Sequence, residues 1–248
     1  MCAAGDVSIS IEGLRRTFGD ITAVDGLDLD LRGPQIVGMA GPNGAGKTTV
    51  IKVLLGLLAP TEGRTSVNGT DSLELTADDR RRIGYMPQNR AIYQDLTVRG
   101  NVEFFAQLYD VEDREAAATR ALDIVDLGDR DDALISELSG GMIRRTSLAC
   151  SLVHDPDLLI LDEPTVGLDP ALRAEMWETF RERRNRGALE IVSTHYLGEA
   201  RHCDRVLFLR DGRVLDFDTP ESFMTRTGTE DLEDAFLTLL RTDGRAES

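Results

Sequence analysis

The 248-residue sequence contains little lysine, few cysteines and no long apolar segment. Lys47 and Lys52 are the only lysines, and acidic residues exceed basic ones enough to give a formal net charge of −16. This balance argues against a general nucleic-acid binder, which needs a basic face. No apolar run approaches the ~18 residues of a membrane helix, and the start MCAAGDVSIS lacks the basic and apolar parts of a secretory signal. We therefore expect a soluble cytoplasmic protein that reaches a membrane only through a partner.

Two explanations fit the scarcity of lysine beside abundant Asp, Glu and Arg. In a proteome adapted to high salt, a solvated acidic surface stays soluble while salt screens its self-repulsion. Alternatively, a GC-rich genome replaces lysine codons with arginine codons. We favour the first hypothesis, which predicts that the stability of the protein changes between low and multimolar KCl.

The three cysteines, Cys2, Cys150 and Cys203, are odd in number and far apart in the sequence. Their spacing fits neither a zinc site nor a disulfide framework, and it agrees with a reducing compartment. Cys150 lies within the apolar run LACSLV, where a small buried core residue is the simplest interpretation.

Segments typical of strands alternate with segments typical of helices, which predicts an α/β fold. VSISIE (7–12) and GLDLDL (26–31) alternate with period two, as half-buried antiparallel strands do, so the leucines of the second should face the core. Residues 97–154 have a mostly helical pattern, and Asp-Gly-Arg at 211–213 predicts a hairpin turn. The other predicted elements are strands at 35–40, 64–67, 83–86, 158–164, 189–193, 205–210 and 213–218, and helices at 47–58 and 231–241.

The segment GPNGAGKTT (41–49) fits the pattern G-x-x-x-x-G-K-[ST] and lies between a predicted buried strand and a helix. Its glycines let backbone N–H groups point inward around a phosphate, and the helix N-terminus adds a positive field. Lys47 would supply a movable charge for the β- and γ-phosphates, Thr48 a hydroxyl for Mg²⁺, and Thr49 a contact to the α-phosphate. The residues predicted to bind nucleotide here are Gly41, Pro42, Asn43, Gly44, Ala45, Gly46, Lys47, Thr48 and Thr49.

A partner for this loop is predicted at the end of a later strand, LLILDEP. Asp162 follows four apolar residues and could hold the Mg²⁺ shell. Glu163, one residue on, could polarise the attacking water as a general base. Taken alone, an apolar run that ends in Asp-Glu could equally be a strand with a polar end.

A third motif, LSGGM (138–142), opens a predicted helix, and the three motifs stand in an order that resembles the ATP-binding subunits of ABC transporters. Ser139, Gly140 and Gly141 at a helix N-terminus form a second anion-binding device, although a Ser N-cap alone would give the same pattern. The resemblance covers nearly the whole chain. It implies a single ABC ATPase domain over 1–248 that binds ATP and Mg²⁺.

The fold implied by the resemblance is a P-loop NTPase (RecA-like) core with an antiparallel β-subdomain and an inserted helical subdomain. On this basis residues 1–87 and 156–248 should form the core with its β-subdomain, and residues 88–155 the helical subdomain.

Five further site residues are implied by the resemblance. Gln88, in YMPQN, matches the glutamine that touches Mg²⁺ and the attacking water, and His195, in STHYLGEA, matches the γ-phosphate histidine. Phe18, in RTFGD, matches the aromatic residue that stacks on adenine, and Val24 belongs to the same nucleotide site. Asp169, in VGLDP, matches the loop that crosses the dimer interface. Without the family, His195 and Phe18 are as readily core residues, and Gln88 a loop residue.

The resemblance also implies a head-to-tail dimer, formed by two copies of the chain or with a paralogous ATPase. Each ATP should lie between residues 41–49 of one subunit and residues 139–142 of the other. ATP binding would close the dimer, and hydrolysis would release it. An integral membrane permease would receive this motion, which would place the chain at the inner face of the cell membrane.

Three segments, 83–111, 194–200 and 203–221, are similar to the subgroup that exports drugs, antibiotics, lipids or polysaccharides. Gly198 departs from the subgroup, which often has Asp there. Residues 89–110 should form the groove for a coupling helix of the permease. Candidate contacts, which could equally be core residues of a helix, are Phe104, Phe105 and Tyr109.

Two other functions are weighed against a transporter ATPase. The first is a soluble ABC-type ATPase that acts on a nucleic-acid or protein assembly. Chromosome and repair members need a long coiled-coil insert between the phosphate loop and the LSGG motif, and the spacing in this sequence leaves no room for one. Translation members usually carry two cassettes, whereas this sequence contains one. The second is a scaffold that binds ATP without hydrolysing it, and the intact Lys47, Asp162, Glu163 and His195 argue against it.

Overall fold

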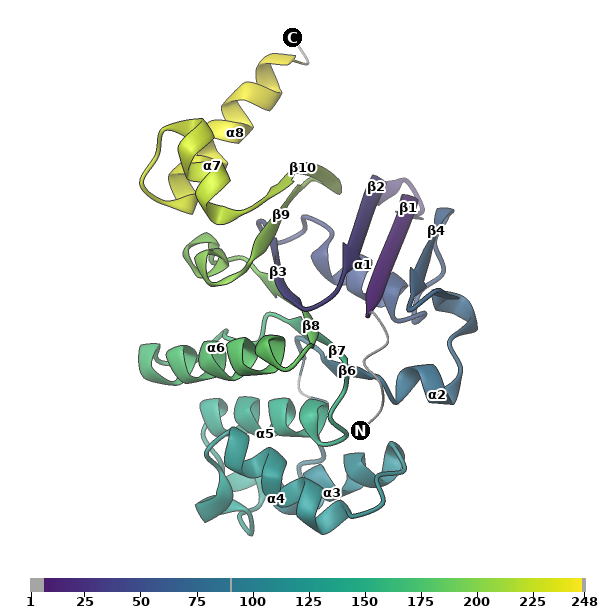
Figure 1. The fold of residues 1–248 in the computed structure, drawn as a ribbon, viewed down its shortest axis with the longest axis vertical. Coiled ribbons are helices and arrows are strands. Elements are labelled where there is room, and N and C mark those ends of the chain that lie inside the picture. The colour runs from purple at the N-terminus through teal and green to yellow at the C-terminus, as the bar shows by residue number, and fades with distance from the viewer. Residues whose placement is uncertain (1–6, 90, 247–248) are drawn as a thin grey trace. The chain divides into compact units, whose positions relative to one another are not determined.

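The computed structural model describes residues 7–89 and 91–246, and these form two compact units (Figure 1). The first unit contains the residues up to Thr76 and from Leu189 onward, and the second contains Ala77–Ala188. Cys2, and Arg90 within the predicted coupling-helix groove, lie outside the described residues. The boundaries 88 and 155 of the helical subdomain remain a prediction.

The antiparallel sheet of the first unit has the strand order β2-β1-β4-β5. The two predicted N-terminal strands are confirmed, and the structure pairs them with each other: Ile9 lies opposite Leu31 and Ile11 opposite Leu29. The leucines of β2 are buried and Asp28 and Asp30 are exposed, as expected for a sheet with one face on the core. Both strands are longer than predicted. The bounds are β1 Ser8–Phe18, β2 Ile21–Arg32, β4 Glu62–Val67 and β5 Thr70–Asp71.

The other strands of the first unit have β3 at their centre. β3 (Gln35–Ala40) pairs in parallel with β8 (Leu189–Thr194) and with β9 (Arg205–Arg210), and β10 (Arg213–Asp218) is antiparallel to β9. The predicted hairpin is confirmed. Its two turn residues, Asp211 and Gly212, have φ of 48° and 81°, as a two-residue hairpin turn requires.

The helices of the first unit correct one prediction and add another element. A helix is predicted over 47–58, but α1 ends at Leu54 because Gly56, with φ of 65°, leaves the helical conformation. The C-terminal helix is confirmed, and its Phe236 ring packs 5.1 Å from that of Phe208. The bounds are α1 Lys47–Leu54, η1 Ser72–Glu74, η4 Leu197–His202, α7 Pro220–Thr227, which was not predicted, and α8 Leu232–Ala246.

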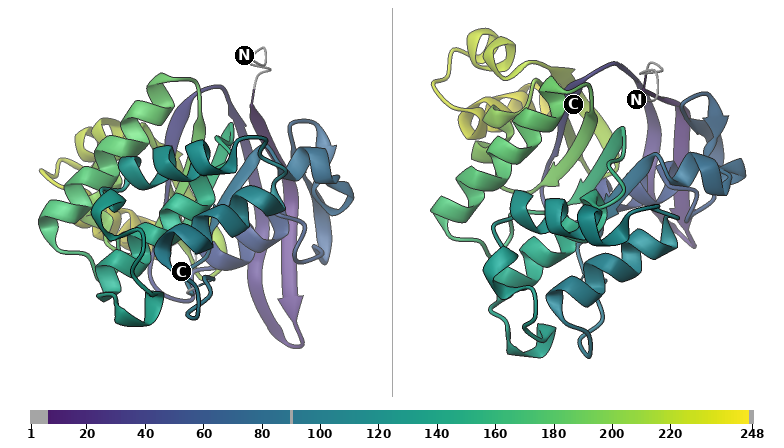
Figure 2. Two further views of the ribbon diagram at one scale, coloured as in Figure 1. Left: turned by 90° about the horizontal axis from the view of Figure 1, so that it is seen from below. Right: turned by 60° about the horizontal axis from the view of Figure 1, so that its bottom comes forward.

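The second unit contains two parallel strands, β6 (Ile83–Met86) and β7 (Leu158–Asp162). Its helices confirm the helical prediction for 97–154, and α3, α4 and α5 each contact the other two (Figure 2). Side chains of Thr97, Asp113 and Ser139 cap their N-termini, which sets where each begins. The bounds are α2 Ala77–Arg80, α3 Val98–Leu108, α4 Arg114–Ile124, η2 Gly128–Arg130, η3 Ile135–Glu137, α5 Gly140–Leu152 and α6 Pro170–Asn185. Within the described part of the chain, no helix has the length and apolar character needed to span a bilayer.

Candidate functional site

The phosphate loop (residues 41–49) joins β3 to α1 in the first unit. Lys47, the first residue of α1, is buried, and its Nζ donates to the carbonyls of Gly41 at 2.7 Å and Pro42 at 3.1 Å. The N-cap of α1 is Gly46, which offers no side-chain cap to the helix N-terminus. A folded loop with a cation at its centre and an uncapped helix start is suited to bind an anion such as a phosphate.

Two glycines fix the shape of the phosphate loop because no side chain would fit there. A Cβ on Gly41 would lie 2.2 Å from the carbonyl oxygen of Leu209. A Cβ on Gly46 would lie 2.5 Å from that of Ala23, and Gly46 also has φ of 102°. A Cβ on Gly44 would have no described atom within 4 Å, so this position, with φ of 84°, needs glycine only for its backbone conformation.

The β9–β10 hairpin supports the phosphate loop. Gly212, in its turn, donates its N–H to the carbonyl of Ala45 at 3.3 Å, and its own carbonyl accepts from the N–H of Asp25 at 2.8 Å. A Cβ on Gly212 would approach the Ala23 carbonyl oxygen to 2.9 Å. The loop is therefore held from outside by backbone groups of β2 and of the hairpin.

The first unit places His195 beside the start of the phosphate loop. His195 directly follows β8, whose last residue, Thr194, accepts the N–H of Gly41 at 3.3 Å. Val24 is buried, and its Cγ2 would lie 3.4 Å from a Cβ on Gly46, so it also lies against the loop. Phe18 ends β1 with 46% of its surface exposed, and the guanidinium of Arg16 lies 4.5 Å from its ring centre. An exposed aromatic ring of this kind can stack on a base.

The second unit brings Gln88 and Glu163 together. Glu163 follows β7 and Gln88 follows the parallel strand β6, and the carboxyl ends of parallel strands share one edge of a sheet. The Nε2 of Gln88 donates to Oε2 of Glu163 at 3.1 Å. Asp162 is 1% exposed at the end of β7. Burial, and secondly the charge of Asp162, raise the pKa of Tyr85 on β6 to about 12.

The backbone of Glu163 has an unusual conformation. Its φ of 52° lies in the left-handed region, which costs a residue with a Cβ roughly 1–2 kcal/mol. Glu163 also precedes Pro164, and a residue before proline favours an extended backbone. Such strain persists only where surrounding contacts impose it, and it is concentrated at functional sites.

Arg144, a residue that sequence reasoning missed, contacts this strained segment. Its guanidinium donates to the carbonyls of Gln88 at 2.8 Å, Pro164 at 3.0 Å and Asp162 at 3.1 Å, and also to that of Glu163. Burial lowers the pKa of Arg144, while the charges of Asp162 and Glu163 act against this shift. The signal available in the sequence was an arginine in the second turn of the helix that LSGGM opens.

Ser139 and Asp169 begin two helices of the second unit. The Oγ of Ser139 accepts the N–H of Met142 at 3.3 Å, and Oδ1 of Asp169 accepts those of Ala171 and Leu172 at 3.0 Å each. Both residues are exposed, as is Gly140, where an added Cβ would have no described atom within 4 Å. Gly141 would place a Cβ 3.4 Å from Cδ1 of Leu172, so the first turns of α5 and α6 lie close together. Ser139 is thus an ordinary N-cap whose exposed surroundings also leave room for a ligand.

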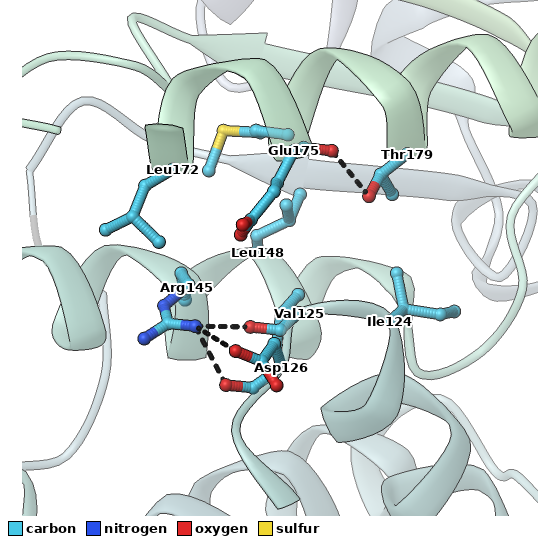
Figure 3. A pocket seen from close by; sticks show the side chains of 9 residues that line it. Ile124, Val125, Asp126, Arg145, Leu148, Leu172, Glu175 and Thr179 are labelled. Carbon is cyan, nitrogen blue, oxygen red and sulfur yellow. Dashed lines mark hydrogen bonds and ion pairs between the residues drawn. The ribbon is translucent and has the colours of Figure 1, made fainter. Parts of the chain in front are cut away.

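A cavity of about 310 Å³ also lies in the second unit, and none of the predicted site residues lines it (Figure 3). Nη1 of Arg145 donates to the carbonyls of Val125 at 3.1 Å and Asp126 at 2.8 Å, which ties α5 to the end of α4. The lining residues are Ile124, Val125, Asp126, Arg145, Leu148, Leu172, Glu175, Met176 and Thr179.

Comparisons with known proteins identify the family. The family model described as ABC transporter matches residues 24–166. The probable multidrug ABC transporter ATP-binding protein YbhF of Escherichia coli is 35% identical over 243 residues, which are 95% of this chain and 42% of YbhF, so the chain spans less than half of that relative. A daunorubicin resistance ATP-binding protein of Streptomyces coeruleorubidus is 39% identical over 231 residues, 92% of this chain and 73% of that protein. A Nod factor export ATP-binding protein of Burkholderia orbicola is 39% identical over 219 residues, 87% and 72% of the two chains.

Solved structures agree. The ATP-binding subunit of an ABC transporter superposes with a TM-score of 0.84 at 28% identity, covering 94% of this chain and 99% of that one. An ATP-binding cassette solved as a dimer in a post-hydrolysis state with ADP and phosphate gives a TM-score of 0.78 at 25% identity, covering 85% and 98% of the chains. The P-loop NTPase fold predicted from the sequence is thereby confirmed. The chain belongs to the ABC transporter family and has the fold of its ATP-binding cassettes.

Proposed function

We propose that the chain is the ATP-binding and ATP-hydrolysing subunit that powers an ABC exporter. The observation that carries this proposal is the phosphate loop, with the Lys47 ammonium held against two loop carbonyls at an uncapped helix start. Export is favoured because the relatives described above are named for multidrug transport, daunorubicin resistance and Nod factor export.

In the first unit, the residues of the phosphate loop would bind the nucleotide. The Lys47 ammonium would exchange its carbonyl partners, Gly41 and Pro42, for β- and γ-phosphate oxygens. The N-terminus of α1 favours the negative charge of the phosphates. His195 would reach the γ-phosphate, and the exposed ring of Phe18 would stack on adenine.

In the second unit, the carboxylate of Glu163 would act as the general base that takes a proton from the attacking water. The amide of Gln88, whose Nε2 donates a hydrogen bond to this carboxylate at 3.1 Å, would orient the water. For Mg²⁺ we propose hard oxygen donors, which this ion prefers: in this unit the side-chain oxygen of Gln88 and the carboxylate of Asp162, and in the first unit the hydroxyl of Thr48. When bound, Mg²⁺ would neutralise charge on the β- and γ-phosphates.

Two chains would complete each reaction centre in a head-to-tail dimer, with a second copy or a paralogous ATPase as the partner. The exposed Ser139 and Gly140 of one subunit would contact the nucleotide bound by the other. Asp169, at the start of α6, would lie at the same interface. The dimeric cassette solved with ADP and phosphate supports this arrangement by analogy.

A membrane permease would dock on α3, which would place the chain at the inner face of the cell membrane. Phe104 is exposed and packs edge to face with Tyr93 at 4.8 Å, whereas the Tyr109 ring stacks on His154 at 3.7 Å and is engaged within the unit. Phe104 is therefore the better candidate contact. It lines a hollow of about 520 Å³, together with Leu96, Arg99, Gly100, Glu103, Gln107, Arg114 and Glu115.

The deciding experiment measures phosphate release from Mg-ATP by the full chain and by Lys47→Ala. Loss of the lysine charge should reduce the rate by about 10²–10³-fold, as removal of one preorganised electrostatic contact does in other enzymes. A wild-type chain that binds Mg-ATP but releases no phosphate would identify a scaffold instead. Co-purification with a nucleic-acid or protein assembly, and with no membrane protein, would favour the soluble ABC-type ATPase.

A further inference from the structure

Arg144 makes an unusual set of contacts for a residue on the surface of a helix. Its four carbonyl partners are three consecutive residues at the end of β7 and just after it, namely Asp162, Glu163 and Pro164, and one residue after β6, Gln88. These are the two segments that carry the proposed general base and the residue that orients the water. A single cation on α5 therefore fixes the main chain of both.

The neighbouring arginine provides a comparison within the same helix. Arg145 also donates to main-chain carbonyls, but its partners are Val125 and Asp126, just after α4. Neither partner belongs to the segments that carry Gln88 and Glu163. Both arginines would strengthen packing of the second unit. Only Arg144 reaches residues with a proposed chemical role.

We propose that Arg144 is a positioning residue for ATP hydrolysis, which holds the backbone of Glu163 in its left-handed conformation and keeps the Glu163 carboxylate against the Gln88 amide. This inference rests on the proposed function. The planar guanidinium has five N–H donors and can serve several carbonyls that converge from different directions. A lysine in its place keeps the charge but has three donors on one nitrogen, so it cannot reproduce the arrangement.

The test is steady-state ATP hydrolysis by the full chain carrying Arg144→Lys or Arg144→Met, with Arg145→Lys as the matched control. Arg144→Lys should lower kcat on the order of 10²-fold, because small misplacements of a catalytic group have effects of this size. KM for ATP should stay within about twofold, because the phosphate loop is untouched. Arg145→Lys should keep kcat within about twofold of the wild type.

A double-mutant cycle with Glu163→Gln separates positioning from general damage. If Arg144 acts through Glu163, adding Arg144→Lys to Glu163→Gln should lower the residual single-turnover rate by less than about twofold. A purely structural role would instead lower the rate by the same factor in both backgrounds.

Three results would overturn the inference: a kcat for Arg144→Lys near the wild-type value, a parallel loss of kcat and ATP affinity, or full additivity with Glu163→Gln. If Arg144→Met does not fold, the lysine variant decides alone. A wild-type chain without ATPase activity would overturn the proposed function and this inference together. An active wild type with an unaffected Arg144→Lys would overturn this inference only.

Discussion

The phosphate loop and the acidic turn (residues 162–164) both lie at the end of a buried strand and both carry proposed chemistry, but their shapes have different origins. The phosphate loop uses glycines where a Cβ would collide with backbone, at Gly41 and Gly46. The acidic turn has no glycine, and it keeps Glu163 at φ of 52° through the side chain of Arg144. One loop is shaped by absent side chains and the other by a side chain from a distant helix.

This difference separates binding from chemistry in the molecule. The phosphate loop is held by backbone groups, so we expect most surface substitutions to leave it unchanged. The acidic turn depends on the placement of α5, whose N-cap is Ser139 of the LSGGM motif. Changes in the second unit should therefore alter hydrolysis more than nucleotide affinity.

The largest expected effect is a loss of hydrolysis without a loss of ATP binding, from a substitution in the acidic turn. Glu163→Gln removes the proposed base and should lower hydrolysis by about 10²–10⁴-fold, while Mg-ATP affinity stays close to that of the wild type. The ATP-bound dimer should then accumulate, which light scattering after gel filtration would detect. A variant that stays monomeric at saturating Mg-ATP would contradict the proposed dimer.

A substitution in the phosphate loop should instead reduce stability and nucleotide binding. Gly46→Ala places a Cβ 2.5 Å from the Ala23 carbonyl oxygen at a φ of 102°, so it should destabilise the fold by at least about 2 kcal/mol and abolish measurable Mg-ATP binding. Gly44→Ala is the control, because its new Cβ would have no described atom within 4 Å. It should lower the free energy of unfolding by only about 1–2 kcal/mol. Equal losses in urea unfolding for both variants would show that contact with Ala23 is unimportant.

The stability of the second unit should depend on pH through His154, which contacts β6, the strand that precedes Gln88. Its Nε2 bonds the carbonyl of Ile83, the first residue of β6, at 3.1 Å, and burial lowers its pKa to about 4. In the unfolded chain a histidine has a pKa near 6.5 and binds a proton more readily. The stability that His154 contributes is thus present above pH 6.5 and is lost as the pH falls toward 4, by up to about 1.4 kcal/mol per pH unit.

Denaturant unfolding of the wild type and of His154→Phe between pH 4 and 7 measures this contribution. The phenylalanine keeps a ring to stack on Tyr109 but does not titrate in this range. We expect the variant to have a shallower pH dependence below pH 6.5. Parallel curves for the two proteins would show that His154 is not the titrating group.

The smallest expected effect measures the strain in the acidic turn. Glu163→Gly and Glu163→Ala both remove the carboxylate, but only glycine relieves a positive φ, by roughly 1–2 kcal/mol, less its greater loss of chain entropy of roughly 0.5–1 kcal/mol. The glycine variant should be about 1 kcal/mol more stable than the alanine variant in urea unfolding. A more stable alanine variant would mean that Glu163 is not strained.

Much of the fold could be predicted because strong local patterns encode it. The alternation in GLDLDL led to the correct strand and buried face, and the Asp-Gly turn at 211–212 led to the correct hairpin. The helix predicted over 47–58 was too long because the positive φ of Gly56 outweighs the apolar pattern beyond it. α6 was not predicted, because its 16 residues bury only Met176, Trp177, Phe180 and Arg183 on an otherwise polar helix, which gives a weak periodic signal.

The candidate site also contains one part that the sequence predicts and one part that it does not. The sequence by itself located the phosphate loop, because its glycines, Lys47 and the flanking strand and helix are consecutive. Only the tertiary structure decided the acidic turn: Arg144 is 56 residues from Gln88 and 19 from Glu163. The energy that holds a strained glutamate comes from a side chain whose direction depends on how α5 packs, and no local pattern records that packing.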